Sequence, residues 1–324
     1  MRTRTWILLV VAALVAVVAS LAIGPVPITP ADIWRALWGG GDSQAVAIIQ
    51  TIRLPRVALG IVVGAGLSMS GHALQSTLRN PLAEPYLLGV SGGAAVGAVL
   101  ASSLGLMQPA VIALASFGGA AVAVALVLAV AHASGVSGQS PALVMAGVVV
   151  GAFANAAILV VLAGAPAGAV RDALWWMMGS LNGATWSSVV WLVCFVVAGA
   201  VALVGLAREI DVLSLGGDAA AALGVDVDRA MRRVFLVAAV VAAATVAAAG
   251  LVGFVGLVVP AIVRALGARS TRSALLAAAL GGAALVIGAD VIARTVRAPA
   301  ELPLGAVTAI IGVPFFLARM RRMR

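Results

Sequence analysis

Residues 211–229 have the sequence DVLSLGGDAAAALGVDVDR, and this polar stretch interrupts a chain that is otherwise strongly apolar. It contains four aspartates and two adjacent glycines, whereas long apolar runs precede and follow it. A polar break between two apolar runs is typical of a connection that leaves the membrane between two spans. The stretch therefore predicts a helical membrane protein with a water-exposed element at residues 211–229.

Capping residues divide this element into two short helices. Asp211 is a good N-cap for a first helix, and Asp218 is a good N-cap for a second helix over residues 219–223. Gly224 suits the position just after that second helix, where a left-handed residue is favoured. Asp226 can then cap the apolar run that follows. We predict two short helices joined by the paired glycines and lying across the membrane surface.

Two interpretations of this element stay open. In the first, it is a solvated loop whose acids balance nearby arginines. In the second, it is a docking element for a separate protein, because an unpartnered polar loop has no need of exposed apolar side chains. The apolar candidates for such a contact are Leu213, Leu215, Leu223 and Val225.

Composition places the rest of the chain in the membrane. Of its 324 residues, 63% are hydrophobic and 10% are charged, with a mean hydropathy of +1.18. Soluble domains carry about 25% charged residues, and about 20 apolar residues cross a bilayer as a helix. We therefore predict an all-α polytopic protein, a single transmembrane domain over residues 1–324 with about ten spans. The predicted spans lie near 6–23, 57–78, 86–106, 110–133, 142–162, 192–206, 234–249, 250–264, 274–291 and from 304 onward.

Arginine alone supplies the positive charge, because the chain contains no lysine and has a net charge of +9. The phosphate loop of ATPases requires a lysine, so we expect ATP hydrolysis to occur on another protein. The single cysteine, Cys194, lies in an apolar run, allows no internal disulfide and is expected in the core. No zinc-protease motif, paired carboxylates or Ser/His/Asp set stands out. We therefore predict no catalytic residues, no metal and no cofactor.

The arginines also predict the orientation. Fourteen of the 20 lie on the side of the two termini when ten spans are counted. By the positive-inside rule, that side is the cytoplasm, and residues 211–229 lie there too. The run at 6–23 lacks a convincing small-x-small cleavage site, so we expect it to be retained as the first span.

Four arginines on the other side could form a basic surface. They are Arg53, Arg56, Arg294 and Arg297. They are either ordinary arginines at the level of the lipid headgroups or a landing site for an acidic partner. Within the predicted spans charge is rare, and Asp290 lies four residues before Arg294, which favours an i,i+4 ion pair.

Several motifs together resemble one family over essentially the whole chain. They are RLPR at 53–56, VGAGLSMSG at 63–71, RNPLAEPYLLGVSGGA at 79–94, WWMMGSLNGATW at 175–186, LGGDAAAALGV at 215–225, GFVGLVVP at 253–260 and ADVIAR at 289–294. The sequence resembles the FecCD-type permease subunits of ABC importers for iron–siderophore complexes, haem and vitamin B12. The resemblance implies the architecture of a type II ABC importer permease. It departs from many family members at Ala261 and in the ARSTR turn at 268–272, where these members have histidines.

The resemblance implies a role for three sets of residues. The set expected to couple to the ATPase is Leu213, Gly216, Gly217, Asp218, Leu223 and Gly224. The set expected to meet glutamates on a substrate-binding protein is Arg53, Arg56 and Arg294. The set expected to form the cytoplasmic gate is Asn80, Leu82, Gln139 and Ser140. The tryptophan-rich stretch at 175–186 is expected to be a short helix over the outer vestibule.

The resemblance thus implies a permease subunit in a bacterial plasma membrane, with cytoplasmic ATPase subunits, a periplasmic or lipid-anchored binding protein and a second permease subunit as partners. The expected cargo is a ferric siderophore, with haem and cobalamin as alternatives. An ion-coupled carrier is a different reading, weakened by the lack of acids placed as an ion relay. An intramembrane enzyme is disfavoured because no nucleophile and base are paired.

Overall fold

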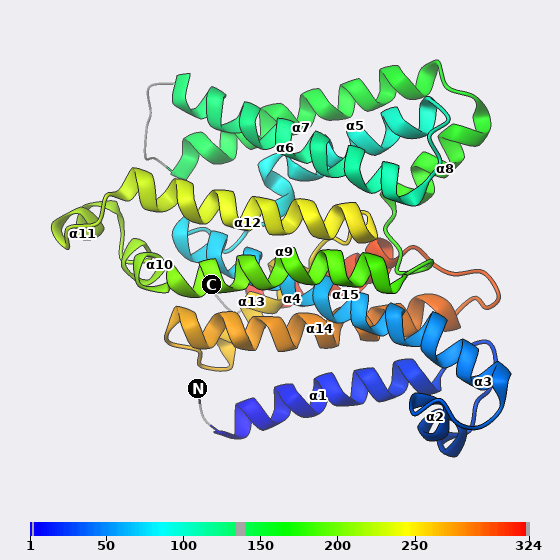
Figure 1. Ribbon diagram of the computed structural model, residues 1–324. Helices are drawn as coiled ribbons and strands as arrows, with labels where there is room; N and C mark the ends of the chain where they lie inside the picture. The colour runs from blue at the N-terminus through cyan, green and yellow to red at the C-terminus, as the bar shows by residue number, and fades with distance from the viewer. Residues whose placement is uncertain (2, 134–139, 322–324) are drawn as a thin grey trace.

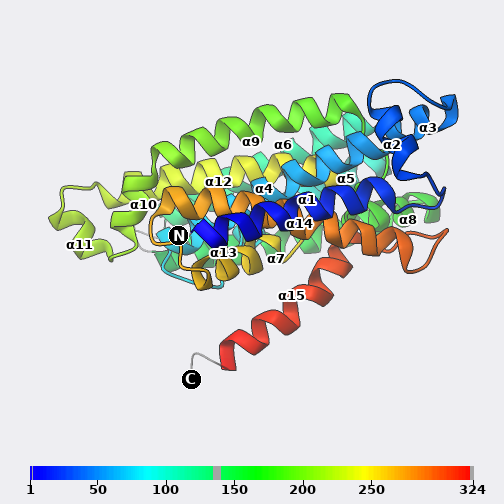
Figure 2. The same cartoon turned by 90° about the horizontal axis from the view of Figure 1, so that it is seen from below.

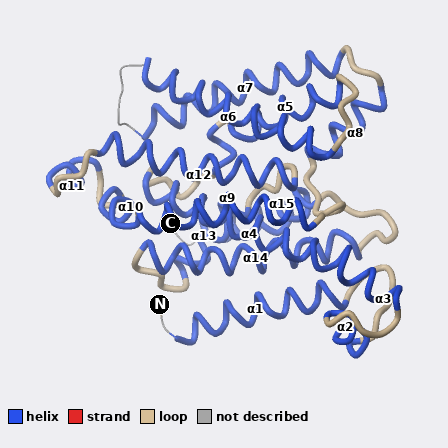
Figure 3. Tube along the Cα trace, viewed as in Figure 1, coloured by secondary structure: helices blue, strands red, loops and turns tan. Residues whose placement is uncertain are grey.

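The computed structural model describes residues 1, 3–133 and 140–321, and every regular element in these ranges is a helix (Figure 3). The elements are α1 (Thr3–Ala22), α2 (Pro30–Leu37), α3 (Ser43–Ala47), η1 (Ile48–Arg53), α4 (Leu54–Thr77), η2 (Pro85–Leu88), α5 (Val90–Ser103), α6 (Pro109–Ala133), α7 (Ser140–Ala163), α8 (Ala167–Met177), α9 (Trp186–Gly205), α10 (Ala207–Leu213), α11 (Gly217–Ala222), α12 (Val227–Ala249), α13 (Val255–Ala265), α14 (Thr271–Thr295) and α15 (Leu304–Arg321). The prediction of an all-α protein is confirmed.

The predicted spans coincide with apolar helices. In the described part of the chain, seven helical segments are long and apolar enough to cross a membrane, and three apolar helices are shorter. The short ones are α5, α13 and the apolar part of α15, which fall on three of the ten predicted spans. The short helix α13 is preceded by non-helical residues 250–254, as the break in that predicted span indicates.

Helix α4 forms the centre of the bundle (Figure 1). Eighteen of its residues are buried, whereas a surface helix buries only one stripe. It contacts α14, α12, α13 and α9. This central position explains why α4 carries small residues along its whole length, since small residues let neighbouring helix backbones approach closely.

Glycine contacts show how close that approach is. A Cβ atom on Gly64 would overlap the backbone of Gly282 in α14, and one on Gly71 would overlap the backbone of Gly256 in α13. In the neighbouring layer, a Cβ atom on Gly97 of α5 would overlap the carbonyl group of Ala115 in α6. Dispersion and backbone contact therefore hold these helices together where the surroundings are apolar.

The bundle has two distinct ends (Figures 1 and 2). The first, which we name the α10 end, carries α10, α11 and the described start of α1. The opposite one, the α2 end, carries α2, α3 and α8. Helix α15 starts within the bundle near the α2 end and runs back toward the α10 end while leaving its neighbours (Figure 2).

Candidate functional site

The segment at residues 211–229 forms two short helices at the α10 end, as predicted (Figure 1). The first helix, however, begins at Ala207 and not at Asp211. It follows α9 almost directly, because Leu206 both ends α9 and precedes α10. The apolar run before the polar stretch therefore does not end the helical structure but turns it across the end of the bundle.

Asp211 does not cap its own helix. It lies inside α10, and its Oδ1 accepts hydrogen bonds from the backbone N of Thr271 at 3.0 Å and from Thr271 Oγ1 at 2.6 Å. Thr271 is the first residue of α14. A carboxylate is stabilised at a helix N-terminus by the unpaired N–H groups and the helix dipole. Asp211 thus attaches α10 to the start of α14.

The cap predictions hold on the C-terminal side of the segment and fail on its N-terminal side. Gly224 has φ +78°, and the N–H groups of Gly224 and Val225 bond back to α11 at 2.9 and 3.0 Å, as in a left-handed helix ending. Asp226 Oδ1 accepts from Arg229 N at 3.1 Å and caps α12. Asp218, by contrast, lies in the first turn of α11, whose N-cap is Gly216 with no side-chain hydrogen bond.

Two leucines of the segment are exposed, as the docking interpretation requires. Leu215 is 62% exposed and Leu223 is 61% exposed. Leu213 is only 3% exposed and packs with Ala220 and Ala230 in a small cluster. The prediction that Leu213 is exposed is wrong, because α10 and α11 fold against the start of α12 and cover it.

The two glycines between the helices differ in their surroundings. Gly216 has φ +121°, and a Cβ atom there would lie 3.1 Å from Nη1 of Arg79. Gly217 is exposed, and nothing lies within 4 Å of the Cβ atom it would carry. Only Gly216 therefore requires glycine for its conformation.

The predicted gate residues begin in the connection after α4. Asn80 Oδ1 accepts from Leu82 N at 2.9 Å, which closes a local turn, and Leu82 is 46% exposed. Ser140 begins α7, and Gln139 lies outside the described residues. The gate role of these four residues stays a prediction.

Arg56 is the centre of an ion-pair network at the α2 end. It is 7% exposed. Its Nε and Nη2 donate to Asp290 at 2.8 to 3.1 Å, and its Nη1 and Nη2 donate to Glu301 at 2.7 and 2.8 Å. One guanidinium group therefore joins α4 to the end of α14 and to the connection that leads to α15.

Arg53 and Arg294 donate hydrogen bonds in the same region. Arg53 is 3% exposed and donates to three backbone carbonyl oxygens between residues 21 and 26 at 2.5 to 3.3 Å. Arg294 is 5% exposed, donates to Ser20 O and Oγ at 2.7 Å, and lies 3.6 Å from Asp290. The predicted i,i+4 pair between Asp290 and Arg294 is confirmed.

These contacts correct the predicted basic surface. Arg53, Arg56 and Arg294 are buried, and their guanidinium groups donate to oxygen atoms of α1, α14 and the connections that follow these two helices. Only Arg297 of the predicted four is exposed. A direct contact of the three buried arginines with a binding protein stays a prediction, and the structure gives them a first role in holding the α2 end together.

Sequence reasoning missed a polar contact beside the break before α13. Glu84 Oε1 accepts from Phe254 N at 2.7 Å, and Tyr86 Oη accepts from Val252 N at 3.1 Å. Burial raises the pKa of the Glu84 carboxyl group, and the hydrogen bond from Phe254 opposes this rise. The two donors belong to a non-helical stretch whose N–H groups have no helical partner. The sequence did contain a signal, because an acid between two prolines in a membrane chain indicates a functional or structural polar contact.

The described part of the chain holds no cluster of metal-ligating side chains, and its cysteine is exposed. No group of three or more His, Cys, Asp or Glu side chains gathers within residues 1, 3–133 and 140–321. Cys194 is exposed on α9, so its predicted place in the core is wrong. The reason is that α9 is packed on one face only, which leaves its other face for lipid.

Comparisons with known proteins find similar proteins over nearly the full length of this chain. The model of the FecCD transport family matches residues 10–322. A cobalamin import system permease protein from Halobacterium salinarum is 43% identical over 284 residues, which cover 87% of this chain and 75% of that protein. A hemin transport system permease protein from Yersinia pestis is 38% identical over 299 residues, covering 90% and 88%. A solved structure, described as an inward-facing metal-chelate type ABC transporter, has a TM-score of 0.89 and 26% identity, covering 99% of this chain and 100% of that one.

Proposed function

The chain belongs to the FecCD transport family, and on this premise we propose how its two ends serve import. It is a multi-pass permease subunit of an ABC importer, a transport component that works with separate ATPase and substrate-binding subunits. The α10 end faces the cytoplasm and the α2 end faces outward in our proposal. The excess of arginine on the side of the termini supports this orientation.

Our proposal for how the ATPase drives the permease rests on one observation, the exposure and attachment of the α10–α11 segment. Leu215 and Leu223 are exposed outside the predicted spans. The segment is tied to the bundle through Asp211 at the start of α14 and continues directly into α12. A force applied to the leucines therefore reaches two long helices. We propose that the ATPase subunit binds this segment, and that Gly216 and Gly217 allow α10 and α11 to adapt to that partner.

At the α2 end we propose an indirect docking role for the buried arginines. Arg53, Arg56 and Arg294 hold the ends of α1, α4 and α14 in one arrangement. The exposed Arg297, which follows α14, then presents a positive charge to an acidic binding protein. Such long-range attraction raises the rate of association more than the final affinity.

We propose that two permease subunits, identical or different, form the pathway between them. The support is the position of α15, which leaves the bundle with Ile310 73% exposed and Leu317 56% exposed (Figure 2). Cross-linking of Ile310→Cys in a Cys194→Ala background tests this. A disulfide-linked dimer in native membranes supports a homodimer. If a neighbouring permease chain forms the cross-link instead, the pair is a heterodimer, and monomer alone contradicts the proposal.

The cargo we propose is a bulky metal chelate. The Halobacterium salinarum relative is named for cobalamin import and the Yersinia pestis relative for hemin transport. The similar solved structure is described as a metal-chelate type transporter. The ferric siderophore expected from the sequence is supported equally with cobalamin and haem.

Reconstitution tests the function. The permease is placed in liposomes with its ATPase, a binding protein loaded with cobalamin, haem or a ferric siderophore is added, and uptake is measured with ATP enclosed. ATP-dependent uptake of one cargo supports the proposal. Uptake without the ATPase, driven by a proton or sodium gradient, contradicts it and identifies an ion-coupled carrier. Labelling of Leu223→Cys in the Cys194→Ala background by an impermeant maleimide then tests the orientation.

A further inference from the structure

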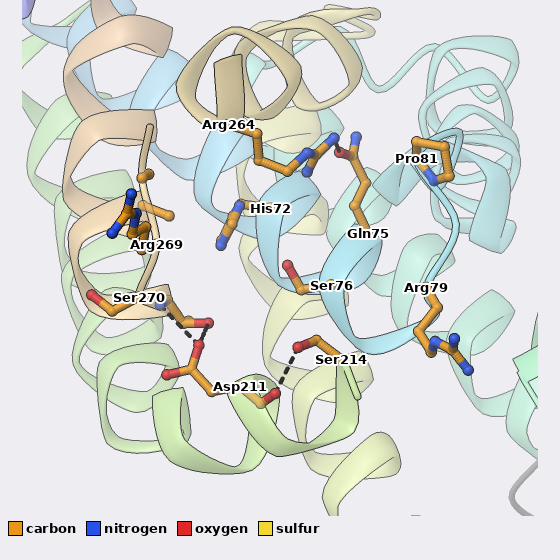
Figure 4. Close-up of a pocket in the computed structure, with 13 residues that line it drawn as sticks. His72, Gln75, Ser76, Arg79, Pro81, Asp211, Ser214, Arg264, Arg269 and Ser270 are labelled. Atoms are coloured by element: carbon orange, nitrogen blue, oxygen red, sulfur yellow. Dashed lines mark hydrogen bonds between the residues drawn. The ribbon is translucent and has the colours of Figure 1, made fainter. Parts of the chain in front are cut away.

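An open cavity lies at the α10 end behind the segment proposed to meet the ATPase. It measures about 330 Å³ and lies between the end of α4, helix α10 and the turn that joins α13 to α14 (Figure 4). Pockets that bind small molecules commonly measure about 300 to 1,000 Å³. This cavity is thus large enough for a small polar ligand or for the headgroup of a larger one.

Positive charge dominates its lining. Arg79, Arg264 and Arg269 line the cavity, whereas Asp211 is the one acid among its lining residues. The carboxylate of Asp211 is already engaged by the start of α14. Within the described residues, no acidic side chain forms an ion pair with Arg79 or Arg269. The cavity therefore attracts an anion that the chain itself does not supply.

The arginine deepest in this cluster is held in place. Arg264 Nη2 donates to Gln75 Oε1 at 2.6 Å, and Gln75 Nε2 donates in turn to Gly256 O at 3.0 Å. This chain of hydrogen bonds fixes Arg264 against α4 before any ligand arrives. Preorganisation of this kind favours binding, because less side-chain freedom is lost when the ligand enters.

His72 is the second and independent sign of a ligand. It is 4% exposed, it lines the cavity, and neither of its ring nitrogens has a hydrogen-bond partner in the described part of the chain (Figure 4). Buried polar groups are nearly always paired, and an unpaired one calls for an explanation. An acceptor placed between His72 and the arginines supplies a partner for the ring nitrogen that carries the proton.

We propose that this cavity binds a phosphate group, carried either by a soluble phosphate compound or by the headgroup of an anionic phospholipid. Phosphate oxygens accept several hydrogen bonds at once, and arginine forks match their geometry. Basic pockets between helix ends at the cytoplasmic surface suit lipid headgroups for the same reason. The binding itself does not depend on the importer function.

A phosphate group bound here would contact the α10–α11 segment as well as the bundle. Asp211 and Ser214 of the α10 region line one side of the cavity, and His72 of α4 lines another. Occupancy therefore favours the arrangement in which α10 rests against α4 and α14. This consequence, unlike the binding, rests on the proposed function of the segment.

The test uses the full-length purified permease with two probes. In the first arm, inorganic phosphate is titrated in zwitterionic detergent against chloride at equal ionic strength. In the second, nanodiscs of phosphatidylcholine are compared with nanodiscs that also contain phosphatidylglycerol. The thermal unfolding midpoint and, for phosphate, the apparent Kd are measured for the native protein, Arg79→Gln/Arg269→Gln and the control Arg272→Gln. Arg272 is an exposed arginine of α14 that does not line the cavity.

The expected result is a raised unfolding midpoint in at least one arm for the native protein and for Arg272→Gln. The double variant should bind at least about tenfold more weakly, because charge-assisted hydrogen bonds are lost. His72→Gln, which keeps a donor, should lie between them. A shift with phosphate assigns a soluble ligand, and a shift with phosphatidylglycerol alone assigns a lipid headgroup.

Three results would overturn the proposal. The first is no shift in either arm. The second is an equal loss in Arg272→Gln and the double variant, which would indicate nonspecific charge. The third is loss of ATPase docking in the double variant without a shift by either probe, which would assign the cavity to an acidic side chain of that partner.

Discussion

The two ends of the bundle use charged residues in opposite ways. At the α2 end, Arg56 is buried and makes bidentate contacts with two carboxylates from distant parts of the chain. At the α10 end, most charged side chains are exposed, and α10 meets the bundle through the buried Ile210 and through the hydrogen bonds of Asp211 to α14. The α2 end is therefore fixed by cross-links between helices, whereas the α10 end offers a surface that a partner can hold.

This difference has a physical basis in the cost of moving each end. A buried ion pair cannot separate without leaving a desolvated charge, so it keeps one arrangement. The exposed Leu215 and Leu223 can change their surroundings without separating a buried charge pair. A transporter that is driven from one side needs both properties, and the chain places them at opposite ends of the bundle.

The largest effect is expected at the fixed end. Arg56→Ala should lower the free energy of unfolding by about 3–5 kcal/mol, because it leaves Asp290 and Glu301 buried or half-buried without their main cation. The matched control is Arg35→Ala at the same end, where the pair with Asp32 is exposed and the loss should be about 0–1 kcal/mol. Denaturant titration in mixed micelles measures both. Equal losses in the two variants would show that the buried ion-pair network does not stabilise the α2 end more than an exposed ion pair does.

A smaller effect is expected at the glycine pair that joins α10 to α11. Gly216→Val should cost about 1–3 kcal/mol, because a branched side chain is strained at φ +121° and meets Arg79. Gly217→Ala should change the free energy of unfolding by less than about 1 kcal/mol, since its Cβ would enter open space. The same titration compares the two. A large loss in both variants would show that the segment is packed more tightly than the structure indicates.

The smallest effect is expected for the helix caps of the segment. Asp226→Ala should destabilise the protein by about 1 kcal/mol through loss of the N-cap of α12. Asp218→Ala removes no side-chain cap and should lose only the interaction of its carboxylate with the dipole of α11, about 0.3–1 kcal/mol, without an effect on α12. Hydrogen exchange at the first turn of α12 locates the change. Protection lost equally in both variants would contradict the assigned cap.

Local features of the fold could be predicted from the sequence because neighbouring residues determine them. The apolar runs coincide with helices, Gly224 ends α11, and Asp226 caps α12. The paired glycines interrupt the helical pattern where the structure has its joint. In each case the physical cause acts within about four residues, so the sequence contains the whole signal.

Contacts between distant residues could not be predicted in the same way. Arg56 and Asp290 are 234 positions apart, and Asp211 and Thr271 are 60 positions apart. No local pattern indicated that Asp211 would accept hydrogen bonds from Thr271 of α14 and not cap its own helix, or that Leu213 would pack with Ala230. For the arginines, position near a span end suggested exposure, whereas Arg53 and Arg294 are buried against the end of α1 and Arg56 is buried against Asp290 and Glu301.

The central claim is that a separate ATPase drives the permease through the exposed part of the α10–α11 segment. The most direct measurement is the ratio of cargo imported to ATP hydrolysed in proteoliposomes for Leu223→Glu, with Leu104→Glu as the control, because Leu104 is 75% exposed and lies outside the α10–α11 segment, as the C-cap of α5. The account predicts that Leu223→Glu loses at least about tenfold in this ratio while the control and the unfolding midpoint stay unchanged. An unaltered ratio in Leu223→Glu would contradict it.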